Sequence, residues 1–371
     1  MLAELERHPH ARAVLGPALD GAGLPSHAYL FHGPGGAGKR AAARALAAQL
    51  LAEGSGDPAG ARARVMSGAH PDLTWVVPSG AHEILVSDID EPVIAAASKT
   101  PFESSRRVFV IERADELGDE AANRMLKTLE EPAAFVHIIL LTDRPSEILP
   151  TIRSRCQAVR FEAPSEERAA AELQELGVTP ATALACVRLA LADADRAREL
   201  AEAEGQALRR AAEGYARAAI ARRMGREKPW VALLAAVRTR GDLAESELEA
   251  LKQAELQLTA KKDKKRVETE WIERIRRTRR RTQTGALDLA LQLVALWFAD
   301  LTFIGLGGPE LVRNCDREAE IAEDADHAIP PHRLRRAVEL VEDTRQRFQL
   351  NVSEDLACEA LAYRLEQALG A

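Results

Sequence analysis

Two short apolar runs, each followed by polar residues, constrain the fold of this chain more than any other feature. Residues 108–111 and 136–141 are apolar at almost every position, which is typical of strands buried on both faces of a parallel sheet. The first run stops at Glu112 and the second at Thr142. Ligands of open α/β sheets bind at the carboxyl ends of the strands, so we expect both residues to lie at a ligand-binding edge.

The segment between the two runs has the pattern of a helix. Asp119 is a suitable N-cap, and Pro132 ends the periodic stretch. Its predicted apolar stripe consists of Ala121, Ala122, Met125, Leu126 and Leu129.

A third strand is predicted near the start of the chain, and a glycine-rich loop follows it. Residues 29–31 form the apolar run, residues 33–40 read GPGGAGKR, and an Ala-rich helix extends to about residue 53. Strand, glycine loop and helix are the context of a P-loop, in which backbone N–H groups and the helix dipole bind phosphate. The alternative is an ordinary glycine turn. The candidate phosphate-binding residues are Gly33, Gly35, Gly36, Gly38, Lys39 and Arg40.

Arg40 departs from the P-loop pattern. A P-loop has Ser or Thr after its lysine, because that hydroxyl binds magnesium. Arginine cannot bind a cation, and it adds positive charge at the same place. We therefore expect ATP binding to be weak or absent.

Length, charge and cysteine content limit the class of protein. A chain of 371 residues has room for two or three domains, and a hydrophobic fraction of 46% supports real cores. With a net charge of −7, any contact with DNA must come from a local patch. The cysteines, Cys156, Cys186, Cys315 and Cys358, lack paired spacing, which favours a reducing compartment and no zinc site.

The sequence indicates a soluble, cytoplasmic protein without membrane contact. Its N-terminal segment lacks the layout of a signal peptide. The longest apolar segment, 286–306, is interrupted by Asp288, Gln292 and Asp300, so we interpret it as a helix of a buried bundle.

The rest of the chain reads as helical. A helix is expected over residues 2–19, and another over 89–99. After residue 161, helices are predicted over 165–176, 180–192 and 195–204, followed by more helices with breaks near Pro229, Gly241, Thr284, 305–309 and Pro330.

A basic segment at 261–281 has two open interpretations. It includes Lys261, Lys262, Lys264 and Lys265, and it ends in the arginine cluster Arg276, Arg277, Arg279, Arg280 and Arg281. Because Glu268, Glu270 and Glu273 are interleaved, it can be a solvated helix face. The arginine cluster can instead contact DNA phosphates.

Three motifs resemble the AAA+ clamp-loader family. ANRMLKTLEEP, LLTDRP and LPTIRSRC occur in this order over residues 122–156. Within the family, the resemblance is to the delta-prime subunits of bacterial DNA polymerase III. It implies a P-loop-type AAA+ core, a parallel sheet with helices on both faces, over residues 1–161. A small helical lid (162–205) and an all-α collar for oligomerisation (206–371) would follow.

The resemblance also implies roles for individual residues. Arg155, in the Ser-Arg-Cys motif, would be an arginine finger that acts in trans at a neighbour's nucleotide. A structural salt bridge is the alternative for Arg155. Thr142 would lie at a sensor position, and Glu112 would be a degenerate Walker B acid with Arg113 after it. Arg196 would be either a second nucleotide sensor or a surface charge.

Together these features predict a stator-type subunit of the replicative clamp loader. Its own ATPase would be weak or absent, and no zinc is expected. Its partners would be gamma/tau-type and delta subunits, the sliding clamp and primed DNA. The alternatives are an active gamma/tau-type motor and an independent AAA+ ATPase that acts on DNA complexes.

Overall fold

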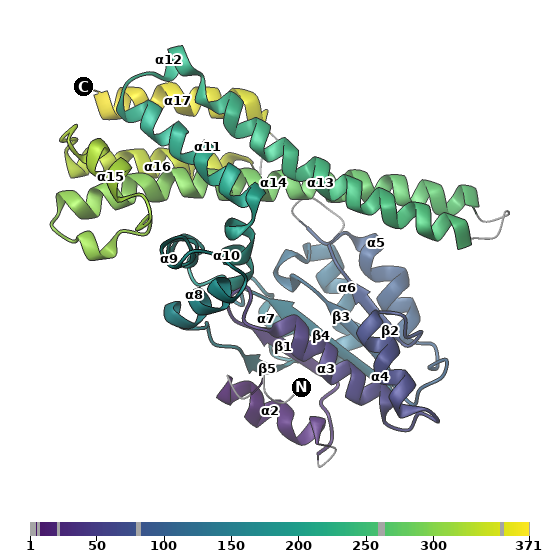
Figure 1. The fold of residues 1–371 in the computed structure, drawn as a ribbon. Helices are drawn as coiled ribbons and strands as arrows, with labels where there is room; N and C mark the ends of the chain where they lie inside the picture. The colour runs from purple at the N-terminus through teal and green to yellow at the C-terminus, as the bar shows by residue number, and fades with distance from the viewer. Residues whose placement is uncertain are drawn as a thin grey trace. The chain divides into compact units, whose positions relative to one another are not determined.

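The chain folds into two compact units, Met1–Pro164 and Ser165–Ala371 (Figure 1). This computed structural model describes residues 5, 8–20, 23–78, 83–258, 264–348 and 352–370. The first unit ends close to the predicted core boundary. The second holds all the helices expected after it, and their division into a lid and a collar stays a prediction.

A five-stranded sheet forms the centre of the first unit. Its strands are β1 (Ala28–His32), β2 (Leu73–Val76), β3 (Arg107–Ile111), β4 (Val136–Thr142) and β5 (Gln157–Arg160). They pair in the order β2-β3-β4-β1-β5, and each described pairing is parallel. Strand β4 is buried at every position, as its apolar sequence predicts. The predicted parallel α/β core is therefore confirmed.

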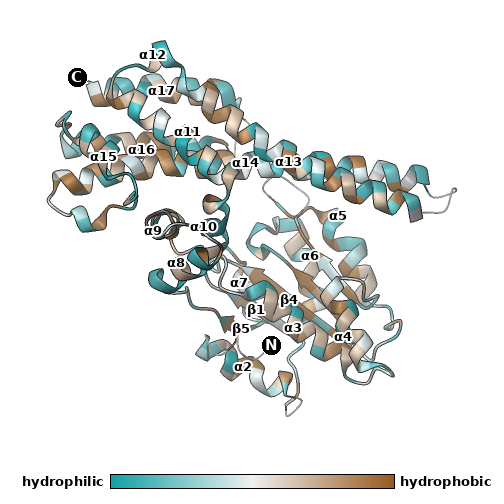
Figure 2. Ribbon diagram, viewed as in Figure 1, coloured by the Kyte–Doolittle hydropathy of each residue, from teal (hydrophilic) through white to brown (hydrophobic). Residues whose placement is uncertain are grey.

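Helices cover both faces of this sheet. The described helices of the first unit are α2 (Pro9–Leu19), α3 (Lys39–Ala52), α4 (Pro58–Ser67), α5 (Val86–Ile89), the π-helix η1 (Asp90–Ala95), the 3₁₀ helix η2 (Ala114–Glu116), α6 (Asp119–Glu130) and α7 (Pro150–Arg153). Tyr29 and Phe31 of β1 pack with α2, α3 and α4, whereas Leu30 packs with η1 and α6 on the other face. Figure 2 draws the strands largely in brown, the colour of apolar residues.

Some predicted helix boundaries in the first unit were wrong. The expected helix over 2–19 is α2 from Pro9 onward, and Leu5 is helical as well, whereas residues 2–4, 6 and 7 of that prediction lie outside the described chain. The helix expected over 89–99 starts earlier, as α5, and continues as η1. The N-cap of α6 is Gly118, so Asp119 lies in the first turn, where its charge still favours the helix dipole.

All the regular secondary structure of the second unit, over its described residues, is helical. Its helices are α8 (Glu166–Glu175), α9 (Pro180–Leu189), α10 (Ala194–Ala201), α11 (Ala203–Ile220), α12 (Met224–Glu227), α13 (Pro229–Leu258), α14 (Lys264–Gly305), the 3₁₀ helix η3 (Pro309–Leu311), α15 (Glu318–Ala325), α16 (Pro331–Arg347) and α17 (Glu354–Gly370). One apolar cluster joins most of them, with Trp297 and Phe298 of α14 among its largest buried side chains.

The predicted breaks at Gly241 and Thr284 were wrong, because α13 and α14 run through them. A Cβ atom on Gly241 would lie 2.5 Å from Cγ of Gln283, so this glycine permits the close approach of α13 and α14. Beyond this crossing the two helices have a small core of their own, formed by Val267, Trp271, Ile275, Leu248 and Leu256. Packing between α13 and α14 before and after Gly241 and Thr284 outweighs the low helix propensity of these single residues.

Helix α14 also contains the predicted bundle helix. By length and composition, Val267–Gly305 could cross a membrane, and 72% of its most apolar window is buried inside the protein. That burial is expected of a core helix.

A pair of glycines on α11 tests the packing between α10 and α11. A Cβ on Gly205 would lie 1.9 Å from the carbonyl oxygen of Glu199, whereas a Cβ on Gly214 meets nothing within 4 Å. We expect Gly205→Ala to lower the free energy of unfolding by roughly 2–3 kcal/mol, because backbone atoms must move. Gly214→Ala should instead be neutral or stabilising by up to about 1 kcal/mol. Urea denaturation of both variants measures the difference, and equal stabilities would contradict this packing.

Candidate functional site

The glycine loop joins β1 to α3 in the geometry expected of a P-loop. Gly36 and Gly38 have positive φ angles of 69° and 83°, and Gly38 is the N-cap of α3. A Cβ on Gly33 would lie 2.2 Å from the carbonyl oxygen of Phe161, so only glycine fits where the loop passes the end of β5. Gly35 lies in the same loop. The first turn of α3 presents N–H groups without intrahelical acceptors, as phosphate binding requires.

Lys39 is held by groups of the protein itself. Its Nζ donates to the carbonyl oxygens of Gly33 (2.6 Å) and Pro34 (2.5 Å). The same atom lies 2.6 Å from Oδ1 of Asp143, and the lysine side chain is only 8% exposed. Asp143 directly follows β4, so the parallel sheet brings this carboxylate to the loop. A phosphate group would have to displace Asp143 to receive the full charge of Lys39.

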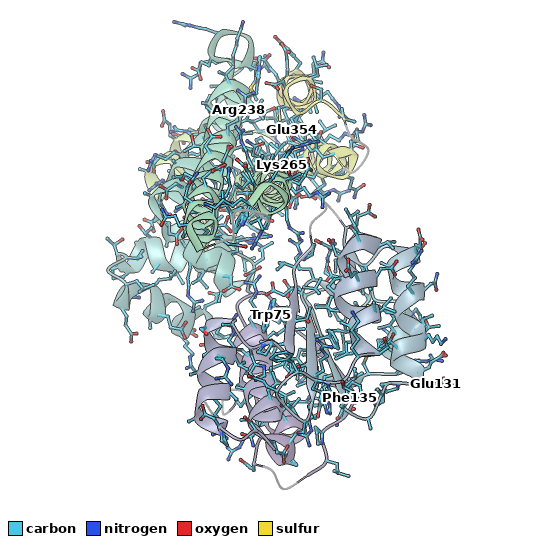
Figure 3. All side chains as sticks on the ribbon, turned by 90° about the vertical axis from the view of Figure 1, so that its right-hand side faces the viewer. Trp75, Glu131, Phe135, Arg238, Lys265 and Glu354 are labelled. Carbon is cyan, nitrogen blue, oxygen red and sulfur yellow. The ribbon has the colours of Figure 1, made fainter. Side chains whose placement is uncertain are left out.

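Arg40 forms an ion pair with Glu112. Its Nε donates to Oε2 of Glu112 at 2.9 Å, and its second terminal nitrogen lies 2.7 Å from the same oxygen. The other oxygen, Oε1, accepts a hydrogen bond of 2.7 Å from Nε1 of Trp75. The Glu112 side chain is 9% exposed, and Arg44 stacks over the Trp75 ring at 4.9 Å. Figure 3 labels Trp75 within the first unit.

These residues do not fit the magnesium ion that P-loop ATPases use. Magnesium requires oxygen ligands at about 2.0–2.1 Å in octahedral geometry. Here a guanidinium replaces the hydroxyl ligand, and both oxygens of the strand-end acid already accept hydrogen bonds from Arg40 and Trp75. A second cation beside Arg40 would also be repelled.

Thr142 is part of a second hydrogen-bond network at the same edge. Its hydroxyl donates to Oδ1 of Asp115 (2.7 Å) and accepts from the backbone N–H of Arg144 (2.9 Å). The Arg144 side chain donates to Oδ2 of Asp115 at 2.9 Å, while Arg113 forms an ion pair with Glu116. The sensor-like threonine is therefore buried and uses its hydroxyl inside the protein.

Arg155 lies after α7, on the turn that leads into β5. Its guanidinium contacts Oε1 of Glu130 at 2.6 Å and donates to the carbonyl oxygen of Thr151 at 2.8 Å. The side chain is 34% exposed and its partner Glu130 is about half exposed. Cys156, the next residue, is inward-facing, and burial raises the pKa of its thiol to about 12. The thiol is therefore protonated at neutral pH, and the side chain packs against the apolar core of the first unit.

The arginines predicted to lie in the lid and the collar have partners within the second unit. Arg196 donates to Oε1 of Gln292 at 2.9 Å. Arg279 pairs with Asp242 (2.7 Å) on α13, and Arg280 pairs with Glu354 (2.8 Å) on α17.

The arginines one turn earlier on α14 have an acidic partner on their own helix. Arg276 and Arg277 pair with Glu273 of their own helix, at 3.6 and 3.9 Å. Lys264 and Lys265 are exposed on α14, whereas Lys261 and Lys262 of the predicted basic segment lie outside the described residues.

Two features of the site were not predicted from the sequence. Asp143, which follows β4, and Trp75, on β2, were not predicted to be the partners of Lys39 and Glu112. Glu130, the partner of Arg155, lies in the motif LEEP, but nothing in the sequence pairs it with that arginine.

Fold and site together define a P-loop-type AAA+ core whose metal-binding positions hold an internal ion pair. Residues 20–165 match the family described as "DNA polymerase III, delta subunit". The chain is 38% identical over 159 residues to DNA polymerase III subunit delta' of Bacillus subtilis, covering 42% of this chain and 48% of the relative. It is 34% identical over 171 residues to subunit gamma/tau of Mycobacterium bovis, covering 43% and 28%.

In its first unit the chain is thus similar to delta-prime-type subunits of the clamp-loader family. It spans about half the length of the delta' relative that it matches. Among solved structures, a gamma-subunit-related protein of Thermotoga maritima aligns over 96% of this chain and 99% of its own, at 15% identity and a TM-score of 0.41.

The internal ion pairs predict how the purified chain responds to ATP. Binding should be weak, since phosphate must displace Asp143 from Lys39, and magnesium should add little to it. ATP hydrolysis should not exceed the background. Calorimetric titration with and without magnesium, together with a phosphate-release assay, measures both properties. Robust turnover that Lys39→Ala abolishes would contradict this account of the site.

Proposed function

We propose that this protein is a stator-type subunit of the replicative clamp loader, acting in the cytoplasm to help load the sliding clamp onto primed DNA. One observation carries the proposal: the Arg40–Glu112 pair replaces a metal site, while the Ser-Arg-Cys turn keeps a partly exposed arginine. A subunit of this kind supplies an arginine finger to its neighbour's nucleotide site and needs no arginine finger at a site of its own.

The chemistry of Arg155 suits a role in trans. A guanidinium can neutralise charge on a transferred phosphoryl group, and arginine fingers contribute on the order of 10³ to 10⁵ in rate elsewhere. In this chain Glu130 neutralises Arg155 at the protein surface, where ion pairs contribute little stability. A triphosphate on a neighbouring subunit, with its higher charge, can therefore replace Glu130 at low cost.

The rival functions require a working site. A gamma/tau-type motor or an independent AAA+ ATPase needs a metal ligand after its P-loop lysine and an available strand-end acid. Arg40 and Glu112 instead bind each other. The proposed partners are accordingly gamma/tau-type motor subunits, a delta subunit, the clamp and primed DNA.

Reconstitution of the complex tests this function. We expect the chain to assemble with motor-type and delta subunits, and we expect Arg155→Ala to assemble equally well. The clamp- and DNA-stimulated ATPase should fall only in part with Arg155→Ala, because the motor subunits supply fingers to each other. Clamp loading should fall further if all sites must act together.

Arg153→Ala is the matched control, since Arg153 is exposed on the same turn. It should leave both ATPase and loading unchanged. Failure of the wild-type chain to assemble would refute the proposed function. Full activity of the Arg155→Ala complex would show that the role of Arg155 is limited to its salt bridge with Glu130.

We further propose that the arginine cluster of α14 contacts DNA within the assembly. The contacts divide the cluster, because Arg279 and Arg280 hold α14 to α13 and α17. Arg276, whose side chain is 79% exposed, is the best candidate for phosphate contact, and Arg277 beside it is tested together with it.

The two halves of the cluster should behave differently when they are replaced. Arg276→Ala with Arg277→Ala should weaken DNA binding by the complex and flatten its salt dependence by about 0.9 in log–log slope for each lost phosphate contact. Arg279→Ala with Arg280→Ala should lower stability instead. Fluorescence anisotropy over a salt series, with thermal unfolding as the companion measurement, separates these effects. Unchanged DNA binding by the first variant would mean that the cluster is a solvated face.

A further inference from the structure

The strand-end carboxylate of Glu112 lies where a metal-binding acid would lie in a P-loop ATPase. It follows β3, it is almost completely buried, and α3 packs beside it. A carboxylate buried in this way must be neutralised by a cation or by hydrogen bonds. In ATPases of this fold class a divalent cation stands at that place, and here Arg40 supplies the positive charge.

The same solution is repeated along the carboxyl edge of the sheet. Lys39 pairs with Asp143, and Arg144 pairs with Asp115 at 2.8 Å. Arg113 pairs with Glu116. Each of these cationic side chains has a carboxylate partner from the same unit, so the edge is neutralised without any ligand.

We infer that Arg40 is a built-in replacement for the divalent cation: it excludes metal from this site and keeps the core folded without one. The Glu112 carboxylate is the oxygen donor at this place, and the guanidinium of Arg40 lies against it. Removal of Arg40 should therefore turn Glu112 into a ligand for a divalent cation. The inference rests on the proposed function only in treating the site as non-catalytic, and it is tested on the isolated chain.

The test is the response of Arg40→Thr to manganese. This substitution places a hydroxyl where P-loop ATPases have one, and it leaves the Glu112 carboxylate with the Trp75 hydrogen bond. Without metal, the melting temperature of the full chain should fall by about 5 °C, because a buried charge loses its ion partner. Millimolar Mn²⁺ should restore most of this loss in the variant and should leave the wild type unchanged.

Two further variants test whether the stabilisation by Mn²⁺ depends on the Glu112 carboxylate and on the position of the substitution. Arg40→Thr combined with Glu112→Gln should lose the response to Mn²⁺, because the carboxylate is gone. Arg44→Thr is the matched control, one turn along α3, where the guanidinium stacks on Trp75. Its melting temperature should be the same with and without Mn²⁺.

If Arg40→Thr folds poorly, counting the metal ions bound to a second variant still tests the inference. Arg40→Gln keeps a hydrogen-bond donor for Glu112 but removes the charge, and electron paramagnetic resonance should show about one more bound Mn²⁺ than in the wild type. The inference is overturned if neither variant gains manganese, or if the wild type binds it equally well. Either result leaves the assembly test of the proposed function unaffected.

Discussion

Glu112 ends a buried strand, and the carboxyl edge of the sheet depends on how its charge is neutralised. A carboxylate with 9% exposure cannot remain there as an isolated ion. Arg40 and Trp75 saturate its two oxygens, and they come from the helix after β1 and from β2. The ion pair therefore connects the start of α3, just after the glycine loop, to the end of β3, and the Trp75 hydrogen bond connects the end of β3 to β2.

This arrangement separates two properties that AAA+ proteins usually combine. The P-loop lies at the end of β1, whereas the Ser-Arg-Cys turn lies between α7 and β5. The partners of the P-loop basic residues are Asp143 and Glu112, and the partner of Arg155 is Glu130. Because the two sets of contacts do not overlap, the residues around the P-loop can change without altering the contacts of Arg155. The proposed stator role requires this independence.

The sequence predicted the parallel core well, because the strands at 108–111 and 136–141 are continuous apolar runs and the glycine loop has a strict pattern. For the same reason it located Glu112 and Thr142 at the strand ends and Lys39 at the end of the glycine loop. It could not predict the partners Trp75 and Asp143, since these meet the loop only through the strand order β2-β3-β4-β1-β5. It also predicted helix breaks at Gly241 and Thr284, which do not occur. There the packing between α13 and α14 keeps both helices continuous, despite the low helix propensity of the two residues.

The measurement that tests the central claim most directly is anomalous diffraction from crystals of the wild-type chain grown with Mn²⁺ and a non-hydrolysable ATP analogue. The account predicts an intact Arg40–Glu112 pair and no manganese peak beside the Glu112 carboxylate. A manganese ion bound to Glu112, with Arg40 turned away, would show that the site still takes a metal and would contradict the account.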